Sequence, residues 1–161
     1  MKALDLRGLN PAPVTPFTRD GAVDYAAIQR LGSWLASVDG VKSLTVLGHA
    51  GEGTFLERDE QFKVIEAFRK AVDDKLPIIA GITLEGTQVA AEEAKRAVAA
   101  GASAGLVYPS HGWLRFGYQK GAPQDKYKAI YEASGLPLIL FQYPDATKCT
   151  CLLYTSDAAD E

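Results

Sequence analysis

The sequence is poor in the residues that mark several large classes of protein. Its only cysteines, Cys149 and Cys151, lie near one end of the 161 residues, which argues against a disulfide framework and, without further ligands nearby, against a zinc site. No apolar run approaches the ~20 residues of a membrane span. Residues 1–17 lack the basic start and apolar stretch of a signal peptide. We therefore expect a cytoplasmic protein with no membrane partner and no metal.

The sequence also lacks an excess of either charge. It has 17 basic and 20 acidic residues, and this balance argues against a nucleic-acid partner, for which a basic excess is usual. The net charge of −3 comes entirely from three acidic residues after Lys148, so the sequence before them is neutral. The hydrophobic fraction of 47% excludes a disordered or fibrous chain and is sufficient for a buried core.

Short β-rich runs alternate with amphipathic helical segments up to about residue 145. Strands are predicted at residues 9–14, 44–47, 77–80, 104–108 and 136–141. Four helices are expected between them, with Asp24, Glu57, Thr87 and Pro123 at their starts and Gly40, Gly101 and Gly135 at the ends of the first, third and fourth. Residues 111–122 are predicted to form a loop.

Helical spacing predicts which side chains of these helices are buried. Lys126 and Lys128 are interpreted as an exposed helix face. The predicted buried positions are Ile28, Leu31, Trp34 and Leu35 in the first helix, Val64, Ile65, Phe68, Ala71 and Val72 in the second, and Tyr127, Ile130 and Tyr131 in the fourth.

The regular spacing of strands and helices is typical of βα units with a parallel sheet. Continuous apolar strands indicate a sheet that is covered on both faces. Two α/β architectures remain open on this pattern, a doubly wound open sheet and a (β/α)₈ barrel, although a complete barrel needs ~250 residues. In both of them ligands bind at the carboxyl ends of the strands.

Polar residues gather at these predicted strand ends. Both histidines of the sequence, His49 and His111, are among them. The aromatic residues Tyr108, Trp113, Phe116 and Tyr118 either line a pocket there or pack on the rim, and Arg115 either meets a second substrate carboxylate or is solvated. The strand-end segments are Thr15, residues 48–52, Gly81, residues 108–111 and residues 141–144.

Several motifs in register resemble the dihydrodipicolinate synthase / N-acetylneuraminate lyase family over about residues 7–145. Residues 11–17 are similar to its opening, and Gly48-x-x-Gly51-Glu52 is similar to its second βα loop. The match continues through residues 77–81, 100–102 and 136–140.

This resemblance implies a TIM barrel and the chemistry of a class I aldolase or lyase. A lysine amine forms a Schiff base with a small 2-oxo acid such as pyruvate, without any cofactor, in an enzyme that is often a homo-oligomer. The resemblance assigns substrate-carboxylate binding to the backbone amides of a loop. That loop would be Gly48, His49, Ala50, Gly51 and Glu52, which could instead be only a tight turn that needs glycine.

Three departures from the family pattern point to a divergent subfamily with another substrate. His49 and Ala50 replace a Thr-Thr pair, and Ser110 and His111 replace a tyrosine pair. Phe141 occupies the position of the catalytic tyrosine and cannot transfer a proton, while Tyr143 follows two residues later. His49 and His111 are candidate acid–base groups, for an aldolase or for hydration and dehydration chemistry, or are solvent-facing loop residues.

The resemblance places the Schiff-base lysine on a sixth strand, and Lys148 is too early to be that residue. Residues 151–161 resemble a translated sequencing adapter, with a natural acidic tail as the alternative. We therefore expect residues 1–148 to be the first five βα units of a partial barrel, inactive alone, and residues 149–161 to lie outside the fold. The alternative is a self-contained five-stranded α/β domain that binds a small molecule.

Overall fold

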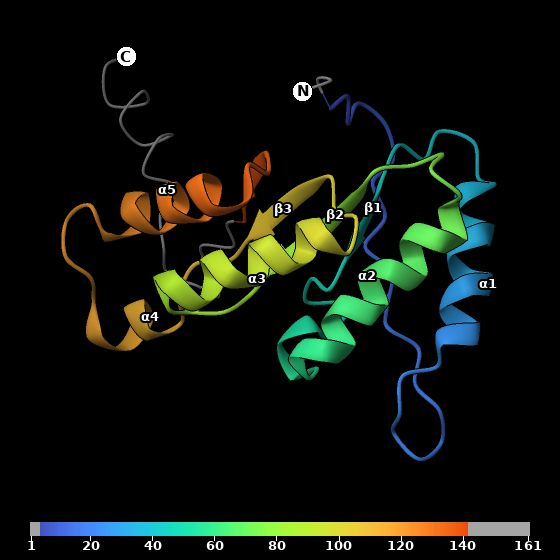
Figure 1. Cartoon of the computed structure of the whole chain (residues 1–161), viewed down its shortest axis with the longest axis horizontal. Helices are drawn as coiled ribbons and strands as arrows, with labels where there is room; N and C mark the ends of the chain where they lie inside the picture. Colours follow the sequence, from blue (N-terminus) through green and yellow to red (C-terminus); the bar gives the residue numbers. More distant parts are fainter. Residues whose placement is uncertain (1–3, 142–161) are drawn as a thin grey trace.

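Four parallel strands form one sheet in the computed structural model, which describes residues 4–141 apart from the side chains of Leu114 and Arg115. Neighbouring strands in the sheet are consecutive in the chain, and helices alternate with them (Figure 1). This order confirms the predicted α/β class and four of the five predicted strands. The strands are β1 (Leu44–Val46), β2 (Ile78–Ile82), β3 (Ala104–Val107) and β4 (Leu138–Leu140).

The first predicted strand, residues 9–14, is instead an extended segment beside β1. Leu9 makes a single parallel bridge with Val41, and the N–H of Thr45 donates to the carbonyl of Pro11 at 2.9 Å. Pro11 and Pro13 have no N–H to donate, so a regular ladder cannot form. The prediction was wrong about the strand, although the segment lies where that strand was expected.

The core lies between the sheet and the helices that pack on it, among them α2 (Arg58–Val72). Glu57 and Glu60 form a capping box at the start of α2, which agrees with the acidic start predicted there. All five α2 positions predicted to be buried are buried. Every residue of β2 is buried too, as expected for a strand that is covered on both faces.

Helix α1 (Tyr25–Ala36) packs beside α2, as Figure 1 shows. It ends at Ala36, four residues before the predicted Gly40, which has a φ of +85° in the following loop. Ile28 and Leu35 are buried as predicted, but Trp34 is 61% exposed. Helical spacing alone therefore placed Trp34 on the wrong face.

Asp24 is the N-cap of α1, and its carboxylate accepts the N–H of Ala27 at 2.9 Å. We expect Asp24→Ala to lower the free energy of unfolding by about 1 kcal/mol, because that N–H loses its acceptor. Asp24→Asn should keep most of the stability. Urea denaturation measures both, with Asp39→Ala as the control, since Asp39 accepts no hydrogen bond within residues 4–141. Equal losses for Asp24→Ala and Asp39→Ala would contradict the assignment of the cap.

Helices α3 (Thr87–Ala99) and α5 (Ala122–Ser134) pack against each other (Figure 1). The N-cap of α3 is Gly86 rather than Thr87. Pro123 lies in the first turn of α5 and Ile130 is fully buried, both as predicted, but Tyr131 is half exposed. The predicted loop at 111–122 contains a short helix, α4 (Gly112–Phe116).

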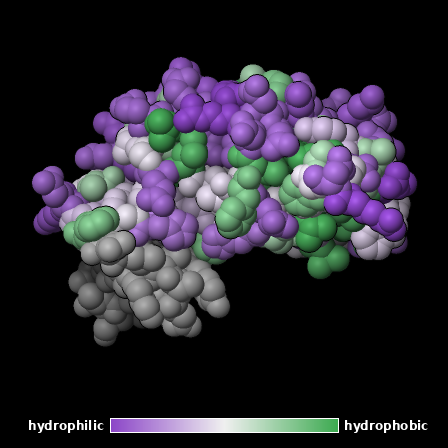
Figure 2. All heavy atoms as spheres, turned by 90° about the horizontal axis from the view of Figure 1, so that it is seen from below, coloured by the Kyte–Doolittle hydropathy of each residue, from purple (hydrophilic) through white to green (hydrophobic). Residues whose placement is uncertain are grey.

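On the face shown in Figure 2, apolar side chains form separate groups rather than one continuous patch. Within residues 4–141 no helix is long and apolar enough to cross a bilayer.

Candidate functional site

A sharp turn follows β1 and forms the centre of the candidate site. Leu47 has a φ of +58°, in the left-handed region that costs a non-glycine residue roughly 1 kcal/mol. Three glycines make room for its backbone. A Cβ on Gly51 would lie 2.9 Å from the nitrogen of Leu47, and one on Gly53 or Gly81 would overlap the Leu47 carbonyl oxygen. The surrounding packing therefore imposes the conformation of this turn.

The predicted binding loop, residues 48–52, continues from this turn. The buried Thr15 hydroxyl donates to the carbonyl of Gly51 at 2.7 Å and thereby fixes the loop to the chain before α1. The N–H groups of Ala50 and Gly51 have no acceptor within residues 4–141. Glu52 is exposed in a left-handed conformation, and its carboxylate accepts no hydrogen bond in the same part of the chain. The loop thus offers unused backbone donors.

Three aromatic rings from different strand ends meet beside this loop. The ring centroids of His49 and Tyr108 are 4.5 Å apart, and those of Tyr108 and Phe141 are 4.4 Å apart. His49 also meets Phe141 edge-on at 5.1 Å. The N–H of His49 donates to the Tyr108 hydroxyl at 3.2 Å, and burial raises the pKa of that phenol. Tyr108 is thus buried against the loop, whereas Phe116 is 82% exposed.

His111 belongs to a different group of side chains. Its Nδ1 lies 3.4 Å from a carboxylate oxygen of Glu85, whose other oxygen accepts the N–H of Gly112 at 3.0 Å. The structure gives no contact between His111 and His49. The two predicted acid–base candidates therefore have different side-chain partners at the same edge of the sheet.

Lys126, predicted to be exposed, is buried, and that prediction was wrong. Its side chain is only 1% exposed, and Nζ donates to the carbonyls of Leu84, Glu85 and Tyr108 and to the hydroxyl of Ser110, all within 3.3 Å. The ammonium thereby ties the β2–α3 loop to the segment that carries His111. Burial lowers the pKa of Lys126 to about 8, against the opposing effect of the Glu93 and Glu85 carboxylates.

The sequence does carry a signal for the burial of this lysine. Lys126 follows Pro123 by three positions and precedes Ile130 by four, so it shares the buried face of α5. Its long stem allows the ammonium to reach carbonyls at the ends of the neighbouring strands.

Glu93 supports the end of β2 from helix α3. Its carboxylate accepts the N–H groups of Thr83 and Leu84, each at 2.9 Å, and the hydroxyl of Thr83 at 3.2 Å. Burial raises the pKa of Glu93, while these hydrogen bonds act in the opposite direction. Helical spacing with the buried Ala90 and Ala97 was the signal for its inward position.

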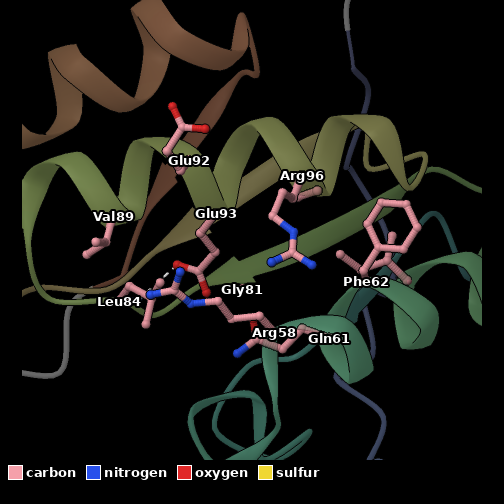
Figure 3. A pocket seen from close by; sticks show the side chains of 11 residues that line it. Arg58, Gln61, Phe62, Gly81, Leu84, Val89, Glu92, Glu93 and Arg96 are labelled. Atoms are coloured by element: carbon pink, nitrogen blue, oxygen red, sulfur yellow. Dashed lines mark hydrogen bonds between the residues drawn. The ribbon is translucent and has the colours of Figure 1, made fainter.

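A small cavity of about 40 Å³ lies between α2 and α3, behind Gly81. Figure 3 shows the side chains of Arg58, Glu93 and Arg96 turned into it. Arg96 also pairs with Asp59 at 2.6 Å. Because small-molecule sites usually need roughly 300 Å³ or more, this cavity suits ordered water better than a substrate.

Several predicted features lie outside the described part of the chain. They are Tyr143, Lys148, Cys149, Cys151 and the side chain of Arg115. Within residues 4–141 no group of His, Cys, Asp and Glu side chains is suited to hold a metal ion.

Comparisons with known proteins agree with the arrangement of the strands. A sequence model of the dihydrodipicolinate synthetase family matches residues 5–157. A 4-hydroxy-tetrahydrodipicolinate synthase of Haloarcula marismortui is 36% identical over 150 residues, which cover 91% of this chain and 46% of that protein. The chain thus spans about half the length of the curated relatives it matches.

Solved structures show the same half-length match. A chloride-inhibited dihydrodipicolinate synthase from Acinetobacter baumannii, complexed with pyruvate, superposes with a TM-score of 0.79 at 35% identity and covers 88% of this chain and 47% of that one. A dihydrodipicolinate synthase from Bacillus anthracis gives a TM-score of 0.82 at 26% identity, with 99% and 53% covered. Of the two architectures left open, the fold is therefore a partial (β/α)₈ barrel.

Proposed function

The chain belongs to the dihydrodipicolinate synthetase family, and from this we propose that it supplies the carboxylate-binding half of a 2-oxo-acid aldolase or lyase site. The observation that carries the proposal is the turn at residues 47–52. It holds the unused N–H groups of Ala50 and Gly51 at the carboxyl end of the sheet. Backbone N–H groups gathered in a turn attract an anion such as a carboxylate.

A 2-oxo acid is the class of substrate we favour. The related Acinetobacter baumannii enzyme is complexed with pyruvate, which combines a carboxylate with a ketone. In the proposed reaction a lysine amine condenses with that ketone, and the iminium so formed makes an adjacent carbon–carbon bond easier to form or break. We propose that the full-length enzyme is a cytoplasmic homo-oligomer and that this chain is inactive alone, since its Schiff-base lysine would lie on a later strand.

The side chains around the turn support a substrate different from that of the related synthases. Phe141 has no hydroxyl, and its ring meets the imidazole of His49 edge-on at 5.1 Å. We propose His49 and His111 as acid–base groups of a divergent subfamily. A hydration or dehydration reaction that uses both histidines on one atom is less favoured, because the two side chains have different partners and no contact with each other.

Titration of the chain with pyruvate tests this proposal. In amide NMR spectra we expect pyruvate to shift the Ala50 and Gly51 signals, because their N–H groups meet its carboxylate. Acetone, a ketone without a carboxylate, is the control and should leave both signals in place. Borohydride treatment of the mixture should trap no adduct detectable by mass spectrometry.

The two measurements separate the parts of the proposal. Unchanged Ala50 and Gly51 signals at saturating pyruvate would rule out carboxylate binding by this loop. A reduced adduct on any lysine would instead show that this chain carries its own nucleophile, and the inactivity of the chain would be disproved.

A further inference from the structure

Tyr108 is buried just after β3, and its hydroxyl hydrogen has no acceptor among residues 4–141. The residue is 4% exposed, and its oxygen accepts the N–H of His49 at 3.2 Å. Within residues 4–141 the phenol O–H donates to no acceptor. Buried phenol hydroxyls usually find a hydrogen-bond partner, and a buried donor without one is costly. The position therefore suits a ligand that brings an acceptor.

The phenol oxygen lies directly against the binding loop. A Cβ on Gly48 would come within 3.0 Å of the hydroxyl, so the missing side chain at Gly48 leaves room for it. The unused N–H groups of Ala50 and Gly51 belong to the same loop. One O–H and two N–H donors thus gather at one turn. A 2-oxo acid has three acceptor oxygens, two on its carboxylate and one on its ketone.

The surroundings of Tyr108 keep the phenol neutral and fix its ring. Burial raises its pKa, so the hydroxyl keeps its proton at neutral pH and can donate to an anion. The rings of His49 and Phe141 contact Tyr108 at centroid distances of 4.5 and 4.4 Å and restrict its rotation. A donor held in this way loses little conformational freedom when a ligand binds.

We propose that the Tyr108 hydroxyl donates a hydrogen bond to a small 2-oxo acid held by the 48–52 loop, which makes Tyr108 a substrate-binding residue. The inference rests on the proposed function and adds to it a donor from β3. Tyr108 would thereby supply the phenol that Phe141 lacks, since the two rings are in contact.

Tyr108→Phe in the full chain tests this inference, with pyruvate as the probe. The variant keeps the ring and loses only the hydroxyl, so we expect the Kd for pyruvate, measured by amide NMR, to rise about tenfold or more. Tyr131→Phe is the matched control, because Tyr131 is half exposed on α5. It should leave the Kd unchanged. Thermal unfolding of both variants checks that the fold is retained.

A second measurement keeps the test valid even when Tyr108→Phe does not fold. In the wild-type chain with ¹³C at the tyrosine Cζ, the Tyr108 signal should move on addition of pyruvate, and the Tyr131 signal should not. Equal pyruvate affinity of wild type and Tyr108→Phe, or an unmoved Tyr108 signal while pyruvate binds, would overturn the role of Tyr108 alone. No binding of pyruvate to the wild type would overturn both this inference and the proposed function.

Discussion

Replacing Gly81 with alanine is expected to lower the free energy of unfolding by about 3 kcal/mol or more. The new Cβ would overlap the carbonyl oxygen of Leu47, and backbone cannot move aside as a flexible side chain can. Relief requires a shift of the turn after β1, whose conformation Gly51 and Gly53 also confine. We therefore expect the variant to lose the proposed binding of pyruvate as well as stability, measured by NMR titration and urea denaturation.

Gly105→Ala is the control for this experiment. Gly105 lies on the neighbouring strand β3, and its nearest contact would be a side-chain carbon of Ile82 at 3.2 Å. Because that side chain can adjust, the loss should be about 1 kcal/mol, with pyruvate binding retained. Equal effects of the two substitutions would mean that the turn does not depend on the missing Cβ at Gly81.

A rise in pH from about 7 to about 9.5 is expected to stabilise the wild type by about 2 kcal/mol relative to Lys126→Met. The folded chain holds the pKa of Lys126 at about 8, below the usual value of 10.5 that the unfolded chain restores. Between these values the unfolded state binds more protons than the folded state, so stability increases with pH. Below the folded pKa this contribution is lost.

Urea denaturation at several pH values, with the methionine variant as the baseline, isolates the contribution of Lys126. Lys128→Met serves as the control, because the Lys128 side chain is 71% exposed on the same helix. Its pH dependence should follow the wild type. A difference between wild type and Lys126→Met that stays constant with pH would show that the lysine titrates alike in both states.

The sequence predicted best where one apolar face decides the structure. In α2, Val64, Phe68 and Val72 recur at helical spacing and all three are buried. The residues of β2 are apolar without alternation, and the strand is buried on both faces. In such segments local pattern and tertiary burial agree, so periodicity is sufficient.

Prediction was poorer where the partners of a side chain come from distant segments. Three acceptors of the Lys126 ammonium are the carbonyls of Leu84, Glu85 and Tyr108, which no spacing rule brings together. Trp34 shows the opposite error, because it has helical spacing but no segment of the described chain covers it. Both positions depend on how neighbouring elements pack rather than on the helix that carries them.

The candidate site likewise has one part that the sequence predicts and another part that depends on tertiary packing. The loop at residues 48–52 was predicted from motifs, and its strand-end position follows from the parallel sheet. The separation of His49 from His111 was not predictable, because it depends on Glu85 reaching His111 from the preceding βα loop. The contact between Tyr108 and the loop likewise requires the three-dimensional register of β1 and β3.

The order of the strands bears on how the chain folds while it is being made. Every ladder joins strands that are consecutive in the chain, from β1 to β4. Each new strand can therefore dock on a finished predecessor as it leaves the ribosome, with only one or two helices and their loops to close. At the other edge, the prolines beside β1 prevent a regular ladder. The strand order thus allows the sheet to grow in the direction of protein synthesis.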